Sequence, residues 1–422
     1  MNPMTPPLAV TGAGMVTAAG RGVDSAWEAL CSGKSLVVPD PDPELAGFSP
    51  IASARCSPLD PESLGADRRA ARIMGRHTHM LLAGVSDAIR EAADEEGGLE
   101  GEDTAFFAGM DSVDPGRDDL VSAALASGGG DSAVDYAKFF NDGMSQIPPL
   151  WPLGMLNAIG FCQVAIQFGL RGDNASFSPG PESAGRAVIE AAESVREGKS
   201  RAALAAGVSA VISARSVARY LNRGFLRPAS GLEAEVPEPF SGKDGTALGE
   251  GAGIIVLEPL ANARKNGKTL AGVLKGWGRA TAGQGASSLA GAIWDSAAKA
   301  LEAASLSPAQ VDLVVPHGEG IWEEDSAEAK AISVLFGKNR PRALATKGAF
   351  GHLLGGSPLV DLLLALRALA RGMVPPSPGV GEGARDVLDF PDAPARSQNM
   401  KHALVLSRGF EGACMAFAVE AA

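Results

Sequence analysis

Gly249-Glu250-Gly251-Ala252-Gly253-Ile254-Ile255-Val256-Leu257 carries a glycine-rich turn directly into four consecutive large apolar residues. A short apolar run bounded by glycines is typical of a strand that is buried within a sheet. With 53 glycines in the whole chain, close packing between helices and sheets is expected. This stretch therefore predicts an α/β fold in which helices cover a buried sheet.

Strand and helix patterns alternate on both sides of this stretch. Before it, Leu8-Ala9-Val10-Thr11 predicts a strand, and residues 72–93 predict an amphipathic helix. After it, strands and helices are expected to alternate over residues 270–274, 289–304, 311–315, 327–336 and 343–346. The alternation predicts two halves with parallel-rich sheets covered by helices, although the halves share no obvious sequence repeat.

Composition and charge exclude several classes of protein. The chain has 422 residues, of which 45% are hydrophobic and 20% are charged, as in ordinary globular proteins. A net charge of −12 argues against binding to nucleic acid or another polyanion, which requires a clustered positive surface. The four cysteines are scattered without a Cys-x-x-Cys pair, so neither a zinc site nor a disulfide framework is indicated.

No stretch of the sequence is typical of a membrane span or a secretion signal. The most apolar stretch, residues 353–373, is interrupted by Asp361 and Arg367 and predicts a packed helix. The first seven residues are proline-rich and lack an apolar core. A soluble, cytoplasmic protein is therefore expected.

Five motifs, most of them glycine-rich, follow one another in an order that resembles the β-ketoacyl synthases of the thiolase superfamily. They are Gly249-Glu250-Gly251-Ala252-Gly253, His317-Gly318-Glu319-Gly320, Asp325-Ser326-Ala327-Glu328, Lys347-Gly348-Ala349-Phe350-Gly351-His352-Leu353-Leu354-Gly355 and Gly409-Phe410-Glu411-Gly412. The resemblance implies an α/β, thiolase-like fold, with two similar halves in a five-layer αβαβα sandwich. An N-terminal half, residues 1–257, would carry the nucleophile position and the dimer contacts. A C-terminal half, residues 258–422, would carry a histidine pair and a gating loop.

The same resemblance assigns the catalytic positions. In the family, a cysteine at a helix N-terminus accepts the acyl chain, and the helix dipole favours its thiolate. Two histidines polarise the malonyl thioester carbonyl, and they match His317 and His352, with Lys347 as their neighbour. The backbone N–H groups of the nucleophile and of Phe410 would form the oxyanion hole.

The nucleophile position departs from the family pattern. Counting back from Gly198 by the family's usual spacing leads to Pro181, which has neither a thiol nor a backbone N–H. One residue would thus remove the nucleophile and half of the oxyanion hole. As a local sequence, a proline followed by Glu182 is also an ordinary helix start.

Three acidic residues alter the expected site further. Glu319 stands where the family commonly has a threonine, Glu411 replaces a glycine of the gating loop, and Glu182 follows the nucleophile position. If these side chains converge, their charges disfavour an anionic malonyl group. No intact catalytic set and no metal site are therefore expected. The relic catalytic positions are Pro181, His317, Lys347, His352 and Phe410.

These features resemble the chain-length factors of type II polyketide systems, which lack the cysteine and pair with an active ketosynthase. The resemblance implies a heterodimer in which this chain shapes the acyl or polyketide tunnel, in polyketide or fatty-acid-like biosynthesis. Acyl carrier protein would deliver the substrate on its phosphopantetheine, and the chain would need no cofactor of its own. The residues expected at the tunnel and interface are Met110, Trp151, Met155, Phe161 and Gln163.

A basic cluster indicates where the carrier protein would bind. Arg68, Arg69, Arg72 and Arg76 gather on an otherwise acidic chain, and carrier proteins are usually acidic. A solvated, charged helix face explains the same pattern equally well.

Three other functions are compatible with the sequence. A malonyl-carrier-protein decarboxylase needs the two histidines and no cysteine. An acyltransferase could use Ser178 or Ser183, although the sequence places no base beside either serine. A homodimeric acyl-binding protein without chemistry is the third, in which His317 and His352 are inherited core residues.

Overall fold

The computed structural model describes residues 6–48, 51–93, 99, 101–114, 117–128, 133–227, 236–397 and 399–422. Its core is an eleven-stranded sheet with the strand order β12-β11-β15-β16-β10-β1-β9-β7-β5-β6, and β2 (Gly20–Arg21) pairs with β1 beside this path. The first half of the chain supplies β1 (Leu8–Thr17), β5 (Thr104–Met110), β6 (Asn174–Phe177), β7 (Ala202–Ser209) and β9 (Gly251–Pro259). The second half supplies β10 (Gly272–Thr281), β11 (Leu313–Val315), β12 (Arg342–Ala343), β15 (His402–Arg408) and β16 (Ala413–Glu420).

The two halves of the sheet have the same topology. Numbered by their order along the chain, the five strands of each half lie side by side as third, second, fourth, fifth and first. The third, second and fourth strands are parallel, whereas the fifth is antiparallel to both of its neighbours. The halves join where β1 pairs with β10. This repeat confirms the prediction of two similar halves, which the sequence itself does not display.

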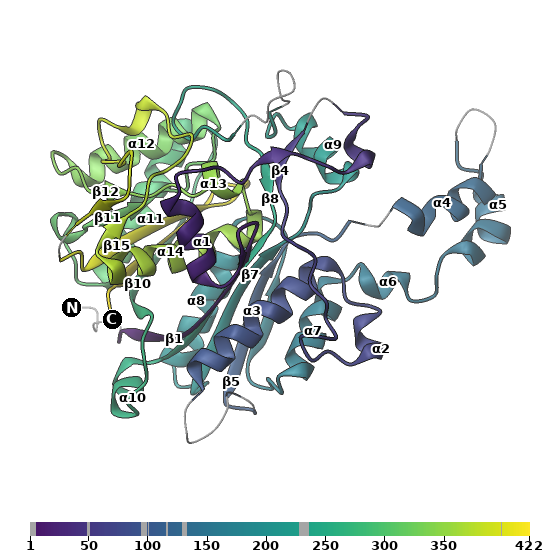
Figure 1. Ribbon diagram of the computed structural model, residues 1–422, viewed down its shortest axis with the longest axis horizontal. Coiled ribbons are helices and arrows are strands. Elements are labelled where there is room, and N and C mark those ends of the chain that lie inside the picture. Colours follow the sequence, from purple (N-terminus) through teal and green to yellow (C-terminus); the bar gives the residue numbers. More distant parts are fainter. Residues whose placement is uncertain are drawn as a thin grey trace.

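Helices cover both halves of the sheet in layers (Figure 1). On the outer face of the first half, α3 (Arg76–Ala92) packs against β1 and β9. On the outer face of the second half lies α11 (Ala286–Ala303), and α12 (Trp322–Phe336) packs against α11. Between the two halves, α8 (Glu182–Arg196) and α14 (Ser357–Arg371) contact each other. The order is the expected αβαβα sandwich.

Glycines of the opening motif let these layers approach each other. A Cβ on Gly249, in β8 (Leu248–Gly249), would lie 2.1 Å from the backbone oxygen of Phe350. A Cβ on Gly253, in β9, would lie 2.8 Å from the backbone of Leu359 on α14. The motif is therefore a contact between the two halves, and its strand is buried as predicted.

The predicted helices are present with shifted ends. The helix expected over residues 72–93 is α3, which begins at Arg76 after the short helix α2 (Arg68–Ala71). The apolar stretch 353–373 contains α14, in which Asp361 is buried inside the protein. Among the residues that the structure describes, no helix combines the length and apolar character needed to cross a membrane.

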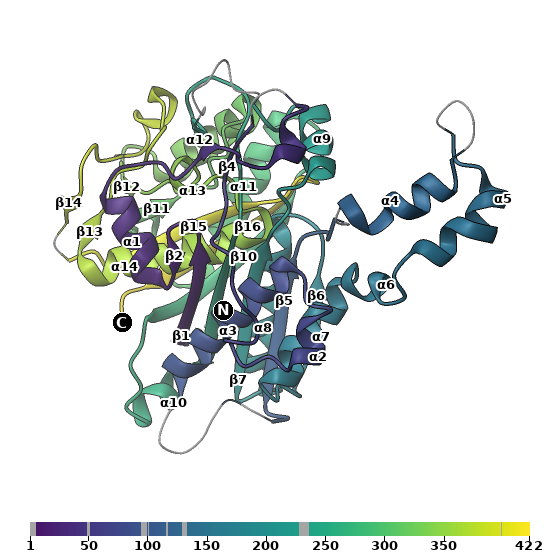
Figure 2. The same cartoon turned by 45° about the vertical axis from the view of Figure 1, so that its right-hand side comes forward.

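One segment projects from the body of the molecule in both ribbon views (Figures 1 and 2). We call residues 117–156 the arm. Its elements are α4 (Arg117–Ala126), α5 (Tyr136–Lys138), η3 (Phe139–Gly143), η4 (Met144–Gln146) and α6 (Trp151–Gly154), and α7 (Asn157–Gln167) returns to the body. Of the thirteen exposed large apolar residues in the described ranges, eight lie in the arm: Val121, Leu125, Val134, Tyr136, Phe140, Met144, Leu150 and Leu156.

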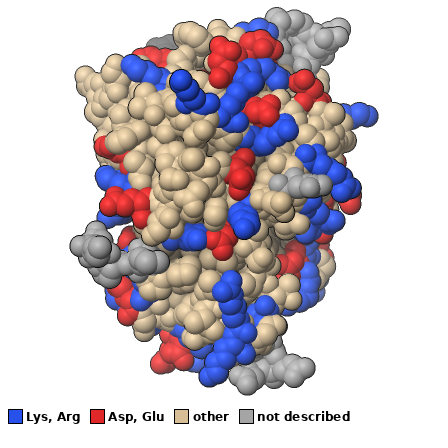
Figure 3. Space-filling view, turned by 90° about the vertical axis from the view of Figure 1, so that its left-hand side faces the viewer, with Lys and Arg blue, Asp and Glu red and all other residues tan. Residues whose placement is uncertain are grey.

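The face opposite the arm carries acidic and basic side chains side by side (Figure 3). On the described part of this face, neither sign of charge forms one broad field.

Candidate functional site

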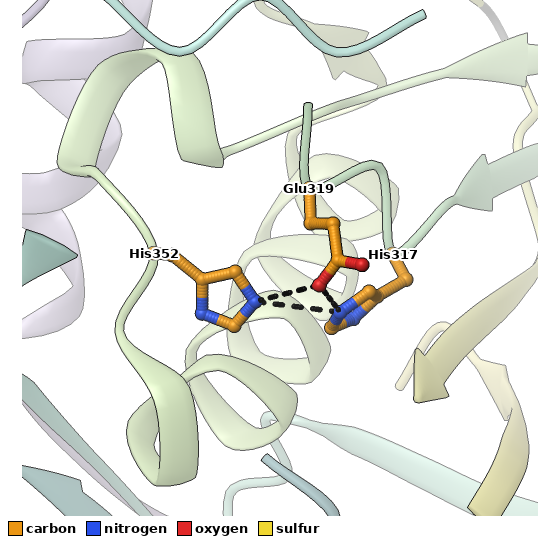
Figure 4. A group of neighbouring side chains, drawn as sticks. All are labelled: His317, Glu319 and His352. Carbon is orange, nitrogen blue, oxygen red and sulfur yellow. Dashed lines mark hydrogen bonds and ion pairs between the residues drawn. The ribbon is translucent and has the colours of Figure 1, made fainter. Parts of the chain in front are cut away.

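Two buried histidines from the second half of the chain face each other (Figure 4). His317 follows β11, and His352 lies between α13 (Lys347–Phe350) and the turn η6 (Leu354–Gly356). Their Nε2 atoms are 3.4 Å apart. An Oε2 atom of Glu319 lies 3.3 Å from Nε2 of His317 and 3.5 Å from Nε2 of His352. The structure thus brings together three residues from two of the predicted motifs.

Two carboxylates on α12 hold the loop that carries His317. Glu328 accepts the backbone N–H groups of His317 and Gly318, at 2.7 and 2.8 Å. Asp325 accepts the N–H groups of the next two loop residues, at 3.0 and 3.1 Å. Burial raises the pKa of both carboxyls to about 7, although these hydrogen bonds favour the charged form. Asp325 and Glu328 therefore fix the loop in place.

Both histidines are neutral near pH 7. Burial, and then the positive charge of Lys347, lowers the pKa of each ring well below its usual value. Nδ1 of His352 accepts a hydrogen bond from the backbone N–H of Leu354 at 2.9 Å, so the neutral ring carries its proton on Nε2. The nearest carboxylate acceptor for this proton is Glu319.

Lys347 lies beside this pair, as the family resemblance implies. Its Nζ is 3.2 Å from Oδ2 of Asp361, and both side chains are almost fully buried. The hydroxyl of Thr346 donates to the other oxygen of Asp361 at 2.5 Å. Asp361 on α14 therefore holds Lys347 in place, and the positive charge of Lys347 disfavours protonation of both histidines.

A buried arginine outside the five motifs completes the cluster. Arg408, the last residue of β15, forms one ion pair with Glu319 and another with Glu324, the latter at 3.2 Å. Burial lowers the pKa of Arg408 to about 10, so the guanidinium stays charged at neutral pH. The sequence does contain a signal for it, because Arg408 closely follows the apolar run 403–406, after Ser407, and a charge needs a partner when buried.

At the other end of the site, α8 begins directly after Pro181, and its first residue is Glu182. The buried carboxylate of Asp111 accepts the backbone N–H of Gly180 at 3.0 Å and that of Gly355 at 2.8 Å. Asp111 therefore holds the start of α8 against the turn η6 of the second half. Pro181 itself has no N–H to offer to a ligand.

A cavity of about 250 Å³ lies in front of α8. It is lined by Asp111, Ser112, Pro179, Gly180, Glu182, Arg219, Tyr220, Arg223, Phe410 and Glu411. Burial raises the pKa of Glu182, and the nearby charges of Asp111 and Glu411 act in the same direction. Two of the three acidic residues expected to converge, Glu182 and Glu411, thus share this cavity. Glu319 is not among its lining residues and lies with the histidines instead.

Aromatic contacts connect this cavity to the histidine pair. The Phe410 ring centroid lies 4.9 Å from that of Phe225 and 6.0 Å from that of Tyr220. Phe225 also packs against His352, with ring centroids 5.3 Å apart. Phe225 therefore contacts both the predicted gating residue Phe410 and His352, and a displacement of the Phe410 ring would change the packing around His352.

Side chains of His317, Glu319 and His352 could by number hold a metal ion, since their ligand atoms lie within 4.8 Å of one another. The donor chemistry does not fit one. A metal-bound histidine normally donates its other ring N–H to an acceptor, whereas Nδ1 of His352 itself accepts the N–H of Leu354. Glu319 is also paired with Arg408. The cluster instead resembles a set of donors around an anion.

The possible nucleophiles have partners that would not activate them. Ser183 donates to the backbone oxygen of Gly180 at 2.7 Å, and the Ser178 hydroxyl accepts from the Asn157 amide at 3.0 Å. Cys162 is exposed on α7, and burial raises the pKa of the Cys414 thiol to about 12. A thiol with a raised pKa is a poor nucleophile at neutral pH.

A second cavity, of about 370 Å³, lies where the arm meets the body. Two of the residues expected at the tunnel, Trp151 and Met155, line this cavity. Two others, Met110 and Phe161, are buried in the packed core between β5 and α7. Gln163 is half-buried on α7.

The basic cluster expected to contact a carrier protein is only partly at the surface. Arg68, Arg69 and Arg72 are exposed, and Arg72 also borders the second cavity. Arg76 instead forms an ion pair with the buried carboxylate of Glu250, at 2.6 Å. Arg76 is half-buried and tied to a core carboxylate, so the other three arginines of the cluster are the exposed ones.

Comparison with known proteins agrees with this fold. Residues 5–263 match the family described as Beta-ketoacyl synthase, N-terminal domain, and residues 271–380 match Beta-ketoacyl synthase, C-terminal domain. Nodulation protein E of Rhizobium meliloti is 26% identical over 415 residues, which cover 96% of each chain. A β-ketoacyl synthase from Burkholderia phymatum has a TM-score of 0.84 at 23% identity, over 99% of this chain and 100% of that one. The ishigamide ketosynthase/chain length factor has a TM-score of 0.82 at 21% identity, again over 99% and 100%. The chain therefore belongs to the β-ketoacyl synthase family.

Proposed function

We propose that this chain is a ketosynthase-family subunit without condensing activity of its own, which pairs with an active ketosynthase in the manner of a chain-length factor. The observation that carries the proposal is the residue before α8. Pro181 directly precedes α8 and supplies neither a thiol nor a backbone N–H, and in this proposal it occupies the position of the family's cysteine. Removing one oxyanion-hole donor alone lowers rates by about 10²–10³-fold in other enzymes.

Neighbouring charges support the absence of condensing activity. Glu182 and Glu411 line the cavity in front of α8, and Glu319 lies between the two histidines. A malonyl group is itself an anion, so these carboxylates oppose its entry. In this proposal Lys347 and Phe410, with the histidines, are the relics of a site that no longer turns over.

The arm offers a surface for the proposed partner. Eight of the exposed large apolar residues in the described ranges lie in the arm, and exposed apolar patches mark many protein–protein contact sites. Within the described residues, the strand β6 at one end of the sheet path also has one edge without a strand partner. A second chain of the same fold would cover both features. The similarity to the ishigamide ketosynthase/chain length factor supports a ketosynthase as that second chain.

The two halves of the chain have different tasks in this proposal. The half at residues 1–257 makes the partner contacts, and the half at residues 258–422 retains the histidine pair and the Phe410 loop. Acyl carrier protein brings the growing chain on its phosphopantetheine, and this subunit needs no cofactor of its own. The cavity beside Trp151 and Met155 then limits the space for the acyl chain.

Co-expression with a ketosynthase that has an intact cysteine tests the proposal. Size-exclusion chromatography is expected to give a one-to-one complex that extends an acyl chain on carrier protein. The isolated chain, incubated with acyl and malonyl carrier proteins, is expected to show no covalent adduct by intact-mass spectrometry. A stable homodimer that ignores the ketosynthase, or an acyl adduct on this chain, would contradict the proposal.

A malonyl-carrier-protein decarboxylase is the alternative that the retained histidines favour, because polarisation of the thioester carbonyl needs no cysteine. The Nε2–H of His352 is a suitable donor for such a carbonyl. Release of CO₂ from malonyl carrier protein by the isolated chain, lost in His317→Ala, would establish this function in place of a silent subunit.

A further inference from the structure

We propose that His317, His352 and Arg408 form a buried anion site, and that this chain fills the site with its own Glu319 carboxylate. Glu319 then excludes an external carboxylate or acyl oxygen from these donors. The inference concerns the same site as the proposed function, but it does not depend on a partner subunit, so the two can fail separately.

The ring nitrogens of this site belong to two neutral imidazoles, and the proton position is fixed for His352. Because Nδ1 of His352 already accepts the backbone N–H of Leu354, its Nε2–H is left as a donor. Both Nε2 atoms approach the same carboxylate oxygen of Glu319, at 3.3 and 3.5 Å (Figure 4). Two ring nitrogens aimed at one oxygen are the arrangement that an anionic or strongly polarised oxygen would occupy.

The positive charge of this site comes from Arg408. Its side chain is only 6% exposed and pairs with Glu319, which is 2% exposed, and with Glu324, which is 33% exposed. A buried guanidinium that loses one of its partners leaves an uncompensated charge and unpaired N–H groups. Arg408 therefore requires an anion at the Glu319 position, whether or not that anion belongs to the chain.

The Glu319 carboxylate is a fixed ligand because its backbone is held in place. Its own N–H donates to Asp325, and the N–H of Gly320 donates to the same carboxylate. The flanking residues Gly318 and Gly320 have φ values of 44° and 86°, a conformation that few other residues adopt. The loop that carries Glu319 therefore has little conformational freedom, and it keeps the side chain next to the two histidines.

This arrangement offers a reason for both histidines to persist beside a position proposed to lack a nucleophile. Both Nε2 atoms approach the Glu319 carboxylate, and Arg408 gains a counter-charge, so the cluster holds an anion without a substrate. A metal ion at the same place would need a lone pair on Nε2 of His352, which carries the proton. The geometry therefore favours an anion over a cation.

Acetate provides the test, because Glu319→Ala removes a group of the same shape from the side chain. The melting temperature of full-length Glu319→Ala is expected to rise with sodium acetate to a saturating value, relative to sodium chloride at equal ionic strength. Wild-type protein is expected to show no such rise, because its own carboxylate already fills the site. A folded Glu319→Ala protein that ignores acetate would overturn the proposal.

Two matched variants make the result specific. Glu319→Gln keeps the space filled and is expected to show no response to acetate. Adding Arg408→Gln to Glu319→Ala removes the cation and is expected to abolish the response. An equal response in Glu319→Gln, or one that survives loss of Arg408, would place acetate elsewhere and contradict the proposal.

A second measurement covers the case in which Glu319→Ala does not fold. Nitrogen NMR of wild-type protein labelled at histidine is expected to show His352 as the tautomer with its proton on Nε2. A proton on Nδ1 would overturn the donor arrangement. So would stoichiometric binding of Zn²⁺ that shifts the resonances of both histidines.

Discussion

The carboxylate of Asp111, in the first half of the chain, accepts the backbone N–H of Gly355, in the second half, at 2.8 Å. Its other oxygen accepts the N–H of Gly180 just before α8. One buried side chain thus joins the two places from which the candidate site is built, the start of α8 and the turn after His352.

Replacing Asp111 is expected to destabilise the whole chain. Asp111→Ala leaves two buried N–H groups without an acceptor, and each costs about 1–3 kcal/mol, so the free energy of unfolding should fall by roughly 2–6 kcal/mol. Asp111→Asn should be milder, because one acceptor oxygen remains. Urea denaturation measures both. Asp135→Ala, at the half-exposed N-cap of α5, is the control and should cost about 1 kcal/mol. An equal loss of unfolding free energy in Asp111→Ala and Asp135→Ala would show that Asp111 does not join the two halves of the site.

A buried histidine on α3 predicts how stability changes with pH. Burial, and then the charge of His79, lowers the pKa of His77 to about 4, whereas an unfolded histidine has a pKa of about 6.5. Between these values the unfolded chain binds the extra proton, so stability from neutral His77 is present above pH 6.5 and is lost as the pH falls toward 4. The loss is about 1.4 kcal/mol per pH unit, or roughly 3 kcal/mol in all.

His77→Gln should remove this part of the pH dependence. The measurement is the free energy of unfolding in urea at several pH values between about 4 and 7.5, for wild type and variant. Parallel curves for the two proteins would mean that the pKa of His77 is the same in the folded and the unfolded chain.

Charge placed on the arm is expected to block the partner without unfolding the chain. Phe140 is 63% exposed in the arm, and Val334 on α12 is 65% exposed and distant in sequence, so the two make a matched pair. Phe140→Asp should weaken the complex with an active ketosynthase, because a charge would be desolvated at the contact. Val334→Asp should leave it intact. Analytical ultracentrifugation at several protein concentrations measures the affinity of each variant for the ketosynthase. Equal affinities for Phe140→Asp and Val334→Asp would show that the arm is not part of the interface.

A thiol placed at position 181 is expected by itself to give little activity. Pro181→Cys returns a thiol and a backbone N–H, but the Glu319 carboxylate still lies between His317 and His352. Adding Glu319→Ala should raise CO₂ release from malonyl carrier protein above that of Pro181→Cys. Release of CO₂ and intact mass are the two measurements. Full condensing activity in Pro181→Cys alone would show that Glu319 is no obstacle.

The exposed arginines of α2 predict salt-dependent binding of an acidic carrier protein. Arg68→Glu with Arg69→Glu should weaken carrier binding, and the loss should be larger at low salt, since exposed charges are screened at high salt. Lys338→Glu, an exposed change in the second half, is the control. Fluorescence anisotropy with labelled carrier protein at two salt concentrations gives both affinities. Unchanged affinity at low salt would leave these arginines as a solvated helix face.

Sequence patterns predict the layers of this fold better than they predict contacts between distant segments. The motif around Gly253 identified a buried strand, and the structure confirms it. Arg76 looked like one of four surface cations because its partner, Glu250, lies 174 residues away along the chain.

Pairing inside the candidate site was hidden from the sequence for the same reason. Glu319 and Glu411 stand in different motifs, and the three acidic residues seemed equivalent. Only the fold places Arg408 beside Glu319. Glu319 therefore lies with the histidines, whereas Glu182 and Glu411 line the cavity in front of α8. The topological repeat was hidden because the two halves keep the same strand order with different residues.

That strand order has a consequence for synthesis of the chain on the ribosome. In each half the first strand pairs with the fifth, and Thr11 on β1 hydrogen-bonds Glu258 on β9 across 247 residues. At translation rates of about 5–20 residues per second, β1 waits roughly 12–50 s for this neighbour. Throughout that interval the nascent chain carries an apolar strand with open edges, so chaperones have a long window in which to bind it.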